Sequence, residues 1–392
     1  MGFINSKGQD QFIKECINGS NIFLTGKAGT GKSYIVKKAI KTLQNQGKVV
    51  IALAPTGIAA YNVGGQTLHS MFALSINGML NFDSCSFLKS AKRKVLEKAR
   101  TIVIDEVSML RPDILDALNW TLHKNGLPGL EQKQIIFVGD MKQLPAPIDD
   151  NMMSVIMRKY NGYTFDYAQI YKSIKPKKIE LQEIQRQSDP VFIENLNIIR
   201  EGGKSEYFRQ FVSNETKGVI LAPHNSTVSM YNNKGLESVK SKLYTFKADI
   251  SGKIKEYDFV LKHLLKVKDG CKIMYLVNSK GNPLYNGTLG IFRRKKGKNY
   301  IEVKGELWLL EPITMEKKEY VFNEGTNKME LQEIGSINQL PIKLAYALTI
   351  HKSQGLTFEE ATIDLTKKCF AKGQLYTALS RVQGPEGLVI KH

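Results

Sequence analysis

Residues 26–33 read GKAGTGKS, directly after the apolar run Ile22–Leu24 and directly before a segment with helical periodicity. This order of strand, glycine-rich loop and helix is the context that the phosphate-binding pattern GxxxxGK[ST] requires. Its glycines let successive backbone N–H groups point at phosphate oxygens, and the following helix adds its positive end. The pattern assigns nucleotide contacts to Gly26, Ala28, Gly29, Thr30, Gly31, Lys32 and Ser33. The stretch therefore predicts a site for a nucleoside triphosphate.

Four side chains in and beyond this loop have distinct chemical roles. Lys32 reaches the β- and γ-phosphates, and Ser33 offers a hydroxyl to magnesium. Asp105 and Glu106 follow the strand-like run Thr101–Ile104. Paired acids at the carboxyl end of a strand suit magnesium handling by the first and water activation by the second. ATP and Mg2+ are therefore the expected cofactors.

The composition limits the class of protein. At 392 residues the chain is too long for one ordinary core, so two or more domains are expected. No apolar run approaches the ~20 residues of a membrane span, and the start, MGFINSKGQD, carries no secretory core. We therefore expect the protein to be located in the cytoplasm if it comes from a bacterium or phage, and in the nucleus or mitochondrion if it comes from a eukaryote. The four cysteines form no CxxC pair and are expected to be reduced and buried.

Positive charge is in excess. The chain has 56 Lys and Arg residues against 37 Asp and Glu residues, a formal net charge of +19, with basic clusters at 89–98, 172–178 and 293–298. A nucleic-acid partner would account for this, because neutralised phosphates release condensed counterions. Solvated faces of a lysine-rich protein account for it equally well. Charge therefore favours a polyanionic partner without identifying one.

Apolar runs alternate with helical patterns in the first 180 residues. The runs at 49–54, 102–104 and 135–138 are continuous, which is typical of a buried parallel sheet covered by helices. They end in the polar clusters APTG, DEVS and GDMKQLP. Ligands in open α/β sheets bind at these carboxyl ends, so Gln143 in the last cluster is placed to detect the γ-phosphate.

The pattern of apolar and polar residues changes after about residue 180. A second α/β region opens near Ile179, with candidate strands at Val219–Ala222 and Lys272–Val277. From Gly287 to about Leu340, short strand-like pieces separated by Gly- and Lys-rich turns predict a small β-barrel-like insertion. The segment Phe72–Lys98 interrupts the first α/β pattern and is expected to be a small insertion.

Nine motifs follow one another along the chain. They are GKAGTGKS (26–33), APTGIAA (54–60), GGQTLHS (64–70), IDEVSML (104–110), GDMKQLP (139–145), QRQ (185–187), NGTLG (286–290), LTIHKSQG (348–355) and YTALSRV (376–382). In this order they resemble a superfamily-one DNA helicase, most closely the petite-integration-frequency (Pif) family with its RecD and phage Dda relatives. EVSML followed by RPDILDAL resembles the stretch that marks the Pif family. The resemblance extends from Gln9 to Leu388.

The resemblance implies an α/β fold with two RecA-like P-loop NTPase domains. The first would span 1–180, with a duplex-splitting wedge insertion at about 72–98. The second would comprise 181–286 and 341–392, interrupted by an SH3-like β-barrel insertion at 287–340. Because little room is left for terminal accessory domains, we expect a minimal motor.

The resemblance also implies roles around the nucleotide. Gln9 would read the adenine, and Asp105 would support the magnesium ion. Arg186 and Arg381 would act as arginine fingers, whose guanidinium groups stabilise charge on the transferring phosphoryl group. The catalytic residues expected are Lys32, Glu106, Gln143, Arg186 and Arg381.

A second set of motifs implies contacts to single-stranded DNA. The residues expected there are Pro55, Thr56, Thr67 and His69 in the first domain, and His224, Asn225, His351, Lys352 and Ser353 in the second. Histidine and lysine suit phosphates, and small hydroxyls beside backbone N–H groups hold a phosphate without reading sequence.

The implied activity is ATP-driven 5′→3′ translocation on single-stranded DNA with unwinding of duplex or forked DNA. It would serve replication, repair, recombination or telomere and quadruplex maintenance, as a monomeric motor beside single-strand-binding or replication proteins. A non-motor ATP-gated binding subunit, an RNA-tracking helicase and a P-loop small-molecule kinase are the alternatives. The kinase would lack LTIHKSQG and YTALSRV.

Overall fold

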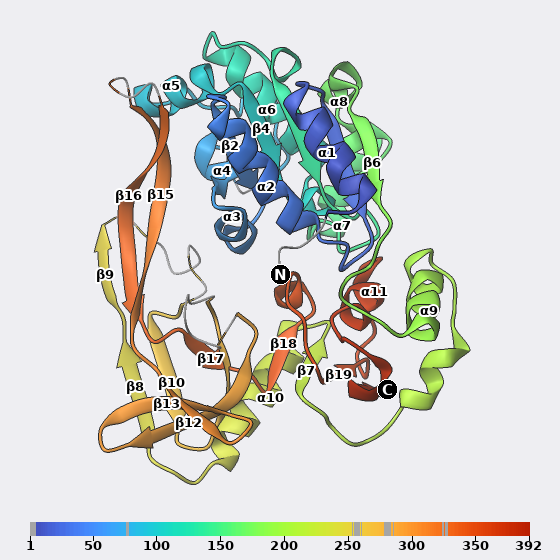
Figure 1. The fold of residues 1–392 in the computed structure, drawn as a ribbon, viewed down its shortest axis with the longest axis vertical. Helices are drawn as coiled ribbons and strands as arrows, with labels where there is room; N and C mark the ends of the chain where they lie inside the picture. The colour runs from blue at the N-terminus through green and yellow to red at the C-terminus, as the bar shows by residue number, and fades with distance from the viewer. Residues whose placement is uncertain are drawn as a thin grey trace. The chain divides into compact units, whose positions relative to one another are not determined.

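The computed structural model describes residues 5–75, 78–252, 254, 259, 261–277, 284, 286–323, 325 and 328–392. It divides into two compact units (Figure 1). Unit 1 comprises Met1–Gln185 and Lys318–Glu333, and unit 2 comprises Arg186–Lys317 and Ile334–His392. Among the described residues, no helix combines the length and apolar character needed to cross a membrane.

Unit 1 is built on a parallel sheet. In the described part of the chain its strands lie in the order β3-β2-β4-β5-β1-β6. They are β1 (Ile22–Gly26), β2 (Val50–Ala54), β3 (Gln66–Thr67), β4 (Thr101–Ile104), β5 (Gln134–Val138) and β6 (Lys177–Leu181). The strands predicted within the first 180 residues are thus confirmed. Because all pairs are parallel, the loops that follow β4, β5 and β1, three adjacent strands, leave from the same edge.

Helices cover both faces of this sheet, since strand side chains alternate between the two. One face carries α1 (Lys7–Ile17), α2 (Lys32–Asn45) and α3 (Gly57–Val63), which pack on Leu24 and Val103. The other carries α4 (Leu68–Met71), α5 (Ser90–Lys98), α6 (Pro112–Lys124) and α8 (Gln169–Ile174), which pack around Phe137. Helix α7 spans Asp150–Tyr160.

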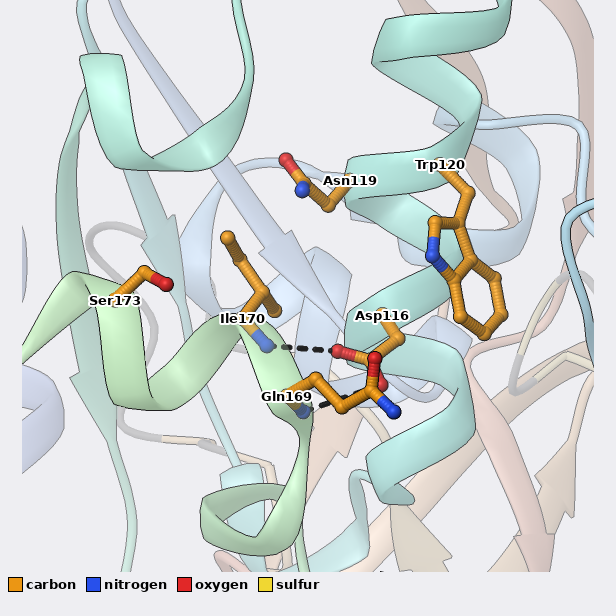
Figure 2. Close-up of a pocket in the computed structure, with 6 residues that line it drawn as sticks. All are labelled: Asp116, Asn119, Trp120, Gln169, Ile170 and Ser173. Carbon is orange, nitrogen blue, oxygen red and sulfur yellow. Dashed lines mark hydrogen bonds between the residues drawn. The ribbon is translucent and has the colours of Figure 1, made fainter.

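The stretch RPDILDAL forms the start of α6, and its two buried aspartates hold neighbouring segments. Asp113 accepts hydrogen bonds from the Leu80 N–H at 2.9 Å and from the guanidinium group of Arg111. This ties the segment at 72–98 to the core. Asp116 accepts the N–H groups of Gln169 and Ile170 at the start of α8 (Figure 2). The cavity of about 200 Å³ beside Asp116 is lined by side chains of α6 and α8 and is separate from the phosphate loop.

Unit 2 contains a second parallel sheet, in the order β18-β7-β19-β20. Its strands are β7 (Val219–Ala222), β18 (Ala347–Thr349), β19 (Ala361–Asp364) and β20 (Leu388–Lys391). The helices of this unit are α9 (Pro190–Arg200), α10 (Asn225–Ser238) and α11 (Gln374–Leu379). The strand predicted at Val219–Ala222 is confirmed.

In the described part of the chain, the remaining strands form antiparallel sheets. They are β8 (Leu243–Lys247), β9 (Asp249–Gly252), β10 (Leu264–Lys268), β11 (Lys272–Tyr275), β12 (Leu289–Lys295), β13 (Lys298–Val303), β14 (Glu306–Leu309), β15 (Ile313–Asn323), β16 (Lys328–Gln339) and β17 (Ile342–Leu344).

One strand prediction is corrected by this pairing. The predicted strand at 272–277 forms as β11, but it pairs with β12 and β17 instead of joining the parallel sheet. A short apolar run does not reveal whether its neighbours will be parallel or antiparallel. In the described residues the antiparallel strands begin at Leu243 and end at Leu344, and those from β12 to β16 lie within the predicted insertion at 287–340.

The distal part of the hairpin β15–β16 belongs to unit 1, where it lies beside α5 (Figure 1). The Tyr320 hydroxyl accepts a hydrogen bond from the Ala52 N–H at 3.1 Å, and the Tyr320 N–H donates to Gln66 Oε1 at 3.0 Å. Glu319 pairs with Lys92 at 3.3 Å. The hairpin thus satisfies a backbone donor on β2, which nothing in the sequence indicated.

Replacing Tyr320 by phenylalanine should lower the free energy of unfolding by about 1–3 kcal/mol, because the buried Ala52 N–H loses its acceptor. Urea denaturation would measure this. Tyr167→Phe is the matched control, because Tyr167 is exposed and should change stability by less than ~0.5 kcal/mol. Equal effects of the two substitutions would show that the Tyr320 hydroxyl does not stabilise unit 1.

Candidate nucleotide site and strand contacts

The phosphate loop joins β1 to α2, and its shape depends on Gly26. That residue has φ 155°, and a Cβ there would lie 2.7 Å from the Leu181 carbonyl oxygen, so no side chain fits. The Lys32 Nζ donates to the carbonyl oxygens of Gly26 at 2.7 Å and Lys27 at 3.0 Å. The Thr30 hydroxyl donates to the same Lys27 carbonyl. The ammonium group is therefore held against the loop in which phosphates would bind.

The acidic pair follows β4 at the same edge. The Asp105 carboxylate accepts the Glu106 N–H at 2.8 Å, and burial, reinforced by the Glu106 carboxylate, raises the pKa of Asp105 to about 7. Glu106 has φ 52° and ψ 44°, a left-handed conformation that is rare outside glycine and frequent at active sites. A Cβ at Gly139, after β5, would lie 2.9 Å from Val107 Cγ2, so glycine lets β5 approach this turn closely.

The donor set fits magnesium. The described residues contain no group of three or more His, Cys, Asp or Glu side chains suited to a metal. Magnesium in nucleotide sites needs no such cage, since phosphate oxygens and water supply most of its ligands. One buried carboxylate, Asp105, and one exposed hydroxyl, Ser33 in the first turn of α2, meet that requirement. A bound cation would also favour the ionised form of Asp105.

Two glutamine side chains flank the loop. Gln9 is buried in the first turn of α1, where its Oε1 accepts the Ser6 N–H in a capping box. A Cβ at Gly31 would lie 3.0 Å from Gln9 Nε2 and 3.2 Å from Gln185 Oε1. The Gln185 N–H also donates to the Gly29 carbonyl oxygen at 2.9 Å. The sequence motif QRQ (185–187) contains Gln185 but predicted a role only for Arg186, so this contact of Gln185 with the loop comes from the structure.

Gln143 lies in the loop that follows β5, and its side chain is largely buried. Its amide donates to Asp140 at 3.5 Å, and the Asp140 side chain is itself buried. The structure therefore brings Gln143, the acidic pair and the phosphate loop to one edge of the sheet of unit 1. Sensing of the γ-phosphate by Gln143 stays a prediction.

The two predicted arginine fingers lie in unit 2. Arg381 is only 2% exposed, and its guanidinium donates to the Thr377 carbonyl oxygen at 3.0 Å and the Ser380 hydroxyl at 2.8 Å. Arg186 donates to the Ser380 carbonyl oxygen at 3.1 Å, and burial lowers its pKa. Both are anchored around Ser380, so either would have to exchange these acceptors for a phosphate.

The predicted strand contacts of unit 1 cluster at helix starts. Thr56 caps α3 and Thr67 caps α4, each hydroxyl accepting a backbone N–H and retaining its own proton to donate. Pro55 immediately precedes this first cap. Burial, aided by the positive charge of Arg111, lowers the pKa of His69, so at neutral pH its imidazole is uncharged. His69 would therefore bind a phosphate as a neutral N–H donor.

In unit 2, His224 and Asn225 lie where β7 passes into α10, with Asn225 exposed. Lys352 is exposed on the short helix His351–Ser353, which follows β18, and burial lowers the pKa of His351. These four residues therefore lie at the carboxyl edge of the second parallel sheet.

Ser353 differs from its neighbours. It is 0% exposed, and its hydroxyl donates to the Ile350 carbonyl oxygen at 2.7 Å. A hydroxyl so enclosed closes the turn of the backbone and is not presented to a strand, so the direct DNA contact predicted for this side chain is not supported. The sequence pattern gave no indication of its burial.

Of the four cysteines, all of which are free thiols, Cys16, Cys85 and Cys271 are buried as predicted. Cys369 is only half-buried, because it lies in the loop between β19 and α11. The described cysteines therefore give no support to a disulfide or a thiolate metal site.

Comparisons with known proteins show which family this chain resembles. Residues 6–209 match the family model of the PIF1-like helicase. The ATP-dependent DNA helicase Pif1 of Campylobacter jejuni is 30% identical over 404 residues, covering 94% of this chain and 88% of the relative. The human ATP-dependent DNA helicase PIF1 is also 30% identical over 406 residues. That match covers 98% of this chain but only 60% of the human protein.

Solved structures of Bacteroides sp. Pif1 share the fold. The complex with ADP-AlF4 matches with a TM-score of 0.88 at 31% identity, and the complex with single-stranded DNA matches with 0.70 at 32% identity. Each match covers 99% of this chain and 92% of the solved chain. These matches confirm the predicted α/β fold with RecA-like domains. The chain belongs to the PIF1-like helicase family and is an ATP-dependent helicase.

Proposed function

We propose that this protein is a Mg-ATP-driven motor that moves 5′→3′ along single-stranded DNA and unwinds duplex or forked DNA as a monomer. The observation that carries the proposal is the edge of the first parallel sheet. There the phosphate loop, Gln143 and the acidic pair follow the three adjacent strands β1, β5 and β4. Family membership supports coupling of this site to strand movement.

In this proposal the residues of unit 1 prepare the hydrolysis. Lys32 exchanges the loop carbonyl oxygens for phosphate oxygens, and Glu106 orients and deprotonates the attacking water. Magnesium, held by Ser33 and Asp105, would neutralise charge on the phosphates. Arg186 and Arg381 supply guanidinium groups as charge develops, and Gln9 reads the adenine.

The nucleic acid is assigned as DNA because the relatives from Campylobacter and human are named DNA helicases and the Bacteroides protein was solved with single-stranded DNA. The contacts proposed are Pro55, Thr56, Thr67, His69, His224, Asn225, His351 and Lys352. Backbone contacts of this kind do not read sequence.

We assign strand separation to the segment at 72–98. Two of its aromatic side chains are exposed, Phe82 at 47% and Phe87 at 76%. The ammonium group of Lys124 lies 5.5 Å and 5.7 Å from the centroids of these two rings. Apolar rings presented in this way suit stacking against the terminal base pair of a duplex.

Single-stranded DNA should stimulate ATP hydrolysis, and its affinity should fall steeply with salt. If about four phosphates are neutralised, the affinity would fall by roughly 50-fold between 50 and 200 mM salt. Hydrolysis with and without oligo(dT), and fluorescence anisotropy across a salt series, would measure both. Stimulation by oligo(U) alone would identify an RNA motor, and no stimulation by either would contradict the motor function.

A further inference from the structure

An exposed aromatic residue lies at the carboxyl edge of the parallel sheet of unit 2. Phe370 is 61% exposed, in the loop between β19 and α11. Because β18, β7 and β19 are adjacent and parallel, the segments that follow them leave from one edge. His351 follows β18 and His224 follows β7, so Phe370 shares this edge with two predicted strand contacts.

The three rings form a row, which we call the aromatic row: His224, Phe370 and His351. The centroids of Phe370 and His351 are 5.9 Å apart with an interplanar angle of 17°. Those of Phe370 and His224 are 5.2 Å apart at 45°. Burial lowers the pKa of His351, so that ring is a neutral aromatic surface at neutral pH.

The loop that carries Phe370 is held by hydrogen bonds. The Phe370 N–H donates to Gln374 Oε1 at 3.0 Å, and the Gln374 amide, which is fully buried, donates to the Pro223 carbonyl oxygen at 3.5 Å. The His224 Nε2 lies 3.1 Å from the Lys368 carbonyl oxygen. The ring is therefore exposed on an ordered backbone, which reduces the entropy that a bound ligand would have to offset.

Four lysines lie on the segments that carry Phe370 and His351. Lys352, Lys367, Lys368 and Lys372 are exposed, and within the described residues none of them pairs with a carboxylate. The exposed Phe370 ring offers a face for stacking, and the exposed lysines offer positive charge for phosphates. A ligand with aromatic faces and negative charge, namely single-stranded nucleic acid, matches both features.

We propose that the aromatic row is a base-stacking platform for the tracked strand, with Phe370 as its principal contact to a nucleobase and the lysines as contacts to phosphates. The proposal rests on the proposed function, since the strand is the one along which the motor would move. Stacking is tolerant of sequence because every base has a π face. Phe370 would thus stack on a base of the strand, whereas the other proposed contacts bind only the sugar-phosphate backbone.

The test compares oligo(dT) with an abasic oligonucleotide of the same length, whose phosphates are intact but whose bases are missing. Phe370→Ala should weaken oligo(dT) binding by roughly 10-fold, the effect of losing one stacked base, and leave abasic binding within about twofold. Phe370→Trp should restore the affinity for oligo(dT), since it retains a stacking face. Tyr167→Ala, at another exposed aromatic residue, should change neither affinity.

The outcomes separate this proposal from the proposed function. Wild-type protein that binds neither oligonucleotide would contradict both. A second set of results would overturn the platform alone. In it, the wild-type protein binds oligo(dT) and hydrolyses ATP, but Phe370→Ala either binds like wild type or loses affinity for both oligonucleotides equally. Thermal unfolding of Phe370→Ala should match wild type, because the side chain removed is mainly exposed.

Discussion

Lys32→Ala should lower ATP turnover by roughly 10³-fold or more and leave single-stranded DNA binding intact. The Lys32 ammonium is the cation that the loop itself supplies, and it already lies within hydrogen-bond distance of the loop carbonyl oxygens. The proposed strand contacts lie on other segments. Steady-state hydrolysis with saturating oligo(dT), together with anisotropy of a labelled strand, would measure both quantities.

Lys41→Ala is the matched control, because Lys41 is an exposed lysine on the same helix α2. Its turnover should stay within about twofold of wild type. Turnover by Lys32→Ala close to that of Lys41→Ala would remove Lys32 from the mechanism. Loss of strand binding in Lys32→Ala would instead show that the two sites share residues.

Arg381→Ala should lower turnover by ~10³-fold while Mg-ATP affinity falls only modestly, because an arginine finger acts mainly on charge in the transition state. The structure adds a second expected effect. Arg381 is buried with acceptors at Thr377, Ser380 and Leu356, so its loss should also destabilise unit 2. Single-turnover hydrolysis below the unfolding transition, combined with thermal unfolding, would separate the two effects.

Arg381→Lys distinguishes the roles further, since an ammonium keeps the charge but lacks the planar fork of donors. A finger role predicts that turnover is not rescued, with strand binding near normal. If Arg381→Ala folds and keeps DNA-stimulated hydrolysis within a few-fold of wild type, Arg381 is a structural residue that holds α11. Arg186 would then be the remaining candidate for the finger.

The nucleotide site was largely predictable because its signals are local. The loop at 26–33, the acids at 105–106 and Gln143 each follow a continuous apolar run, and such runs form buried parallel strands. Strand direction then brings the polar ends to one edge. The capping box of Ser6 and Gln9 is likewise a local pattern.

Net charge predicted the nucleic-acid-binding surface less well, because ion pairing of a basic side chain depends on residues that are distant in the sequence. Arg293, in a predicted basic cluster, pairs with Glu302 and Asp269, and Arg294 stacks 4.7 Å from the centroid of the Tyr244 ring. The two arginines of that cluster are therefore engaged within the protein, whereas its lysines are exposed. By contrast, the exposed lysines Lys367, Lys368 and Lys372, close to Phe370 in the chain, lie outside the three basic clusters that the sequence analysis identified.

The sequence by itself determined the fold class, the strands of the first sheet and the residues at its edge, since each depends on neighbours a few positions away. Tertiary structure alone decided that β11 joins an antiparallel sheet and that the Ser353 side chain is buried. It further decided that the Tyr320 hydroxyl accepts the Ala52 N–H of β2. It also decided that Phe370 lies between two histidines. These features depend on which distant segments pack together, and one-dimensional periodicity carries no information about that choice.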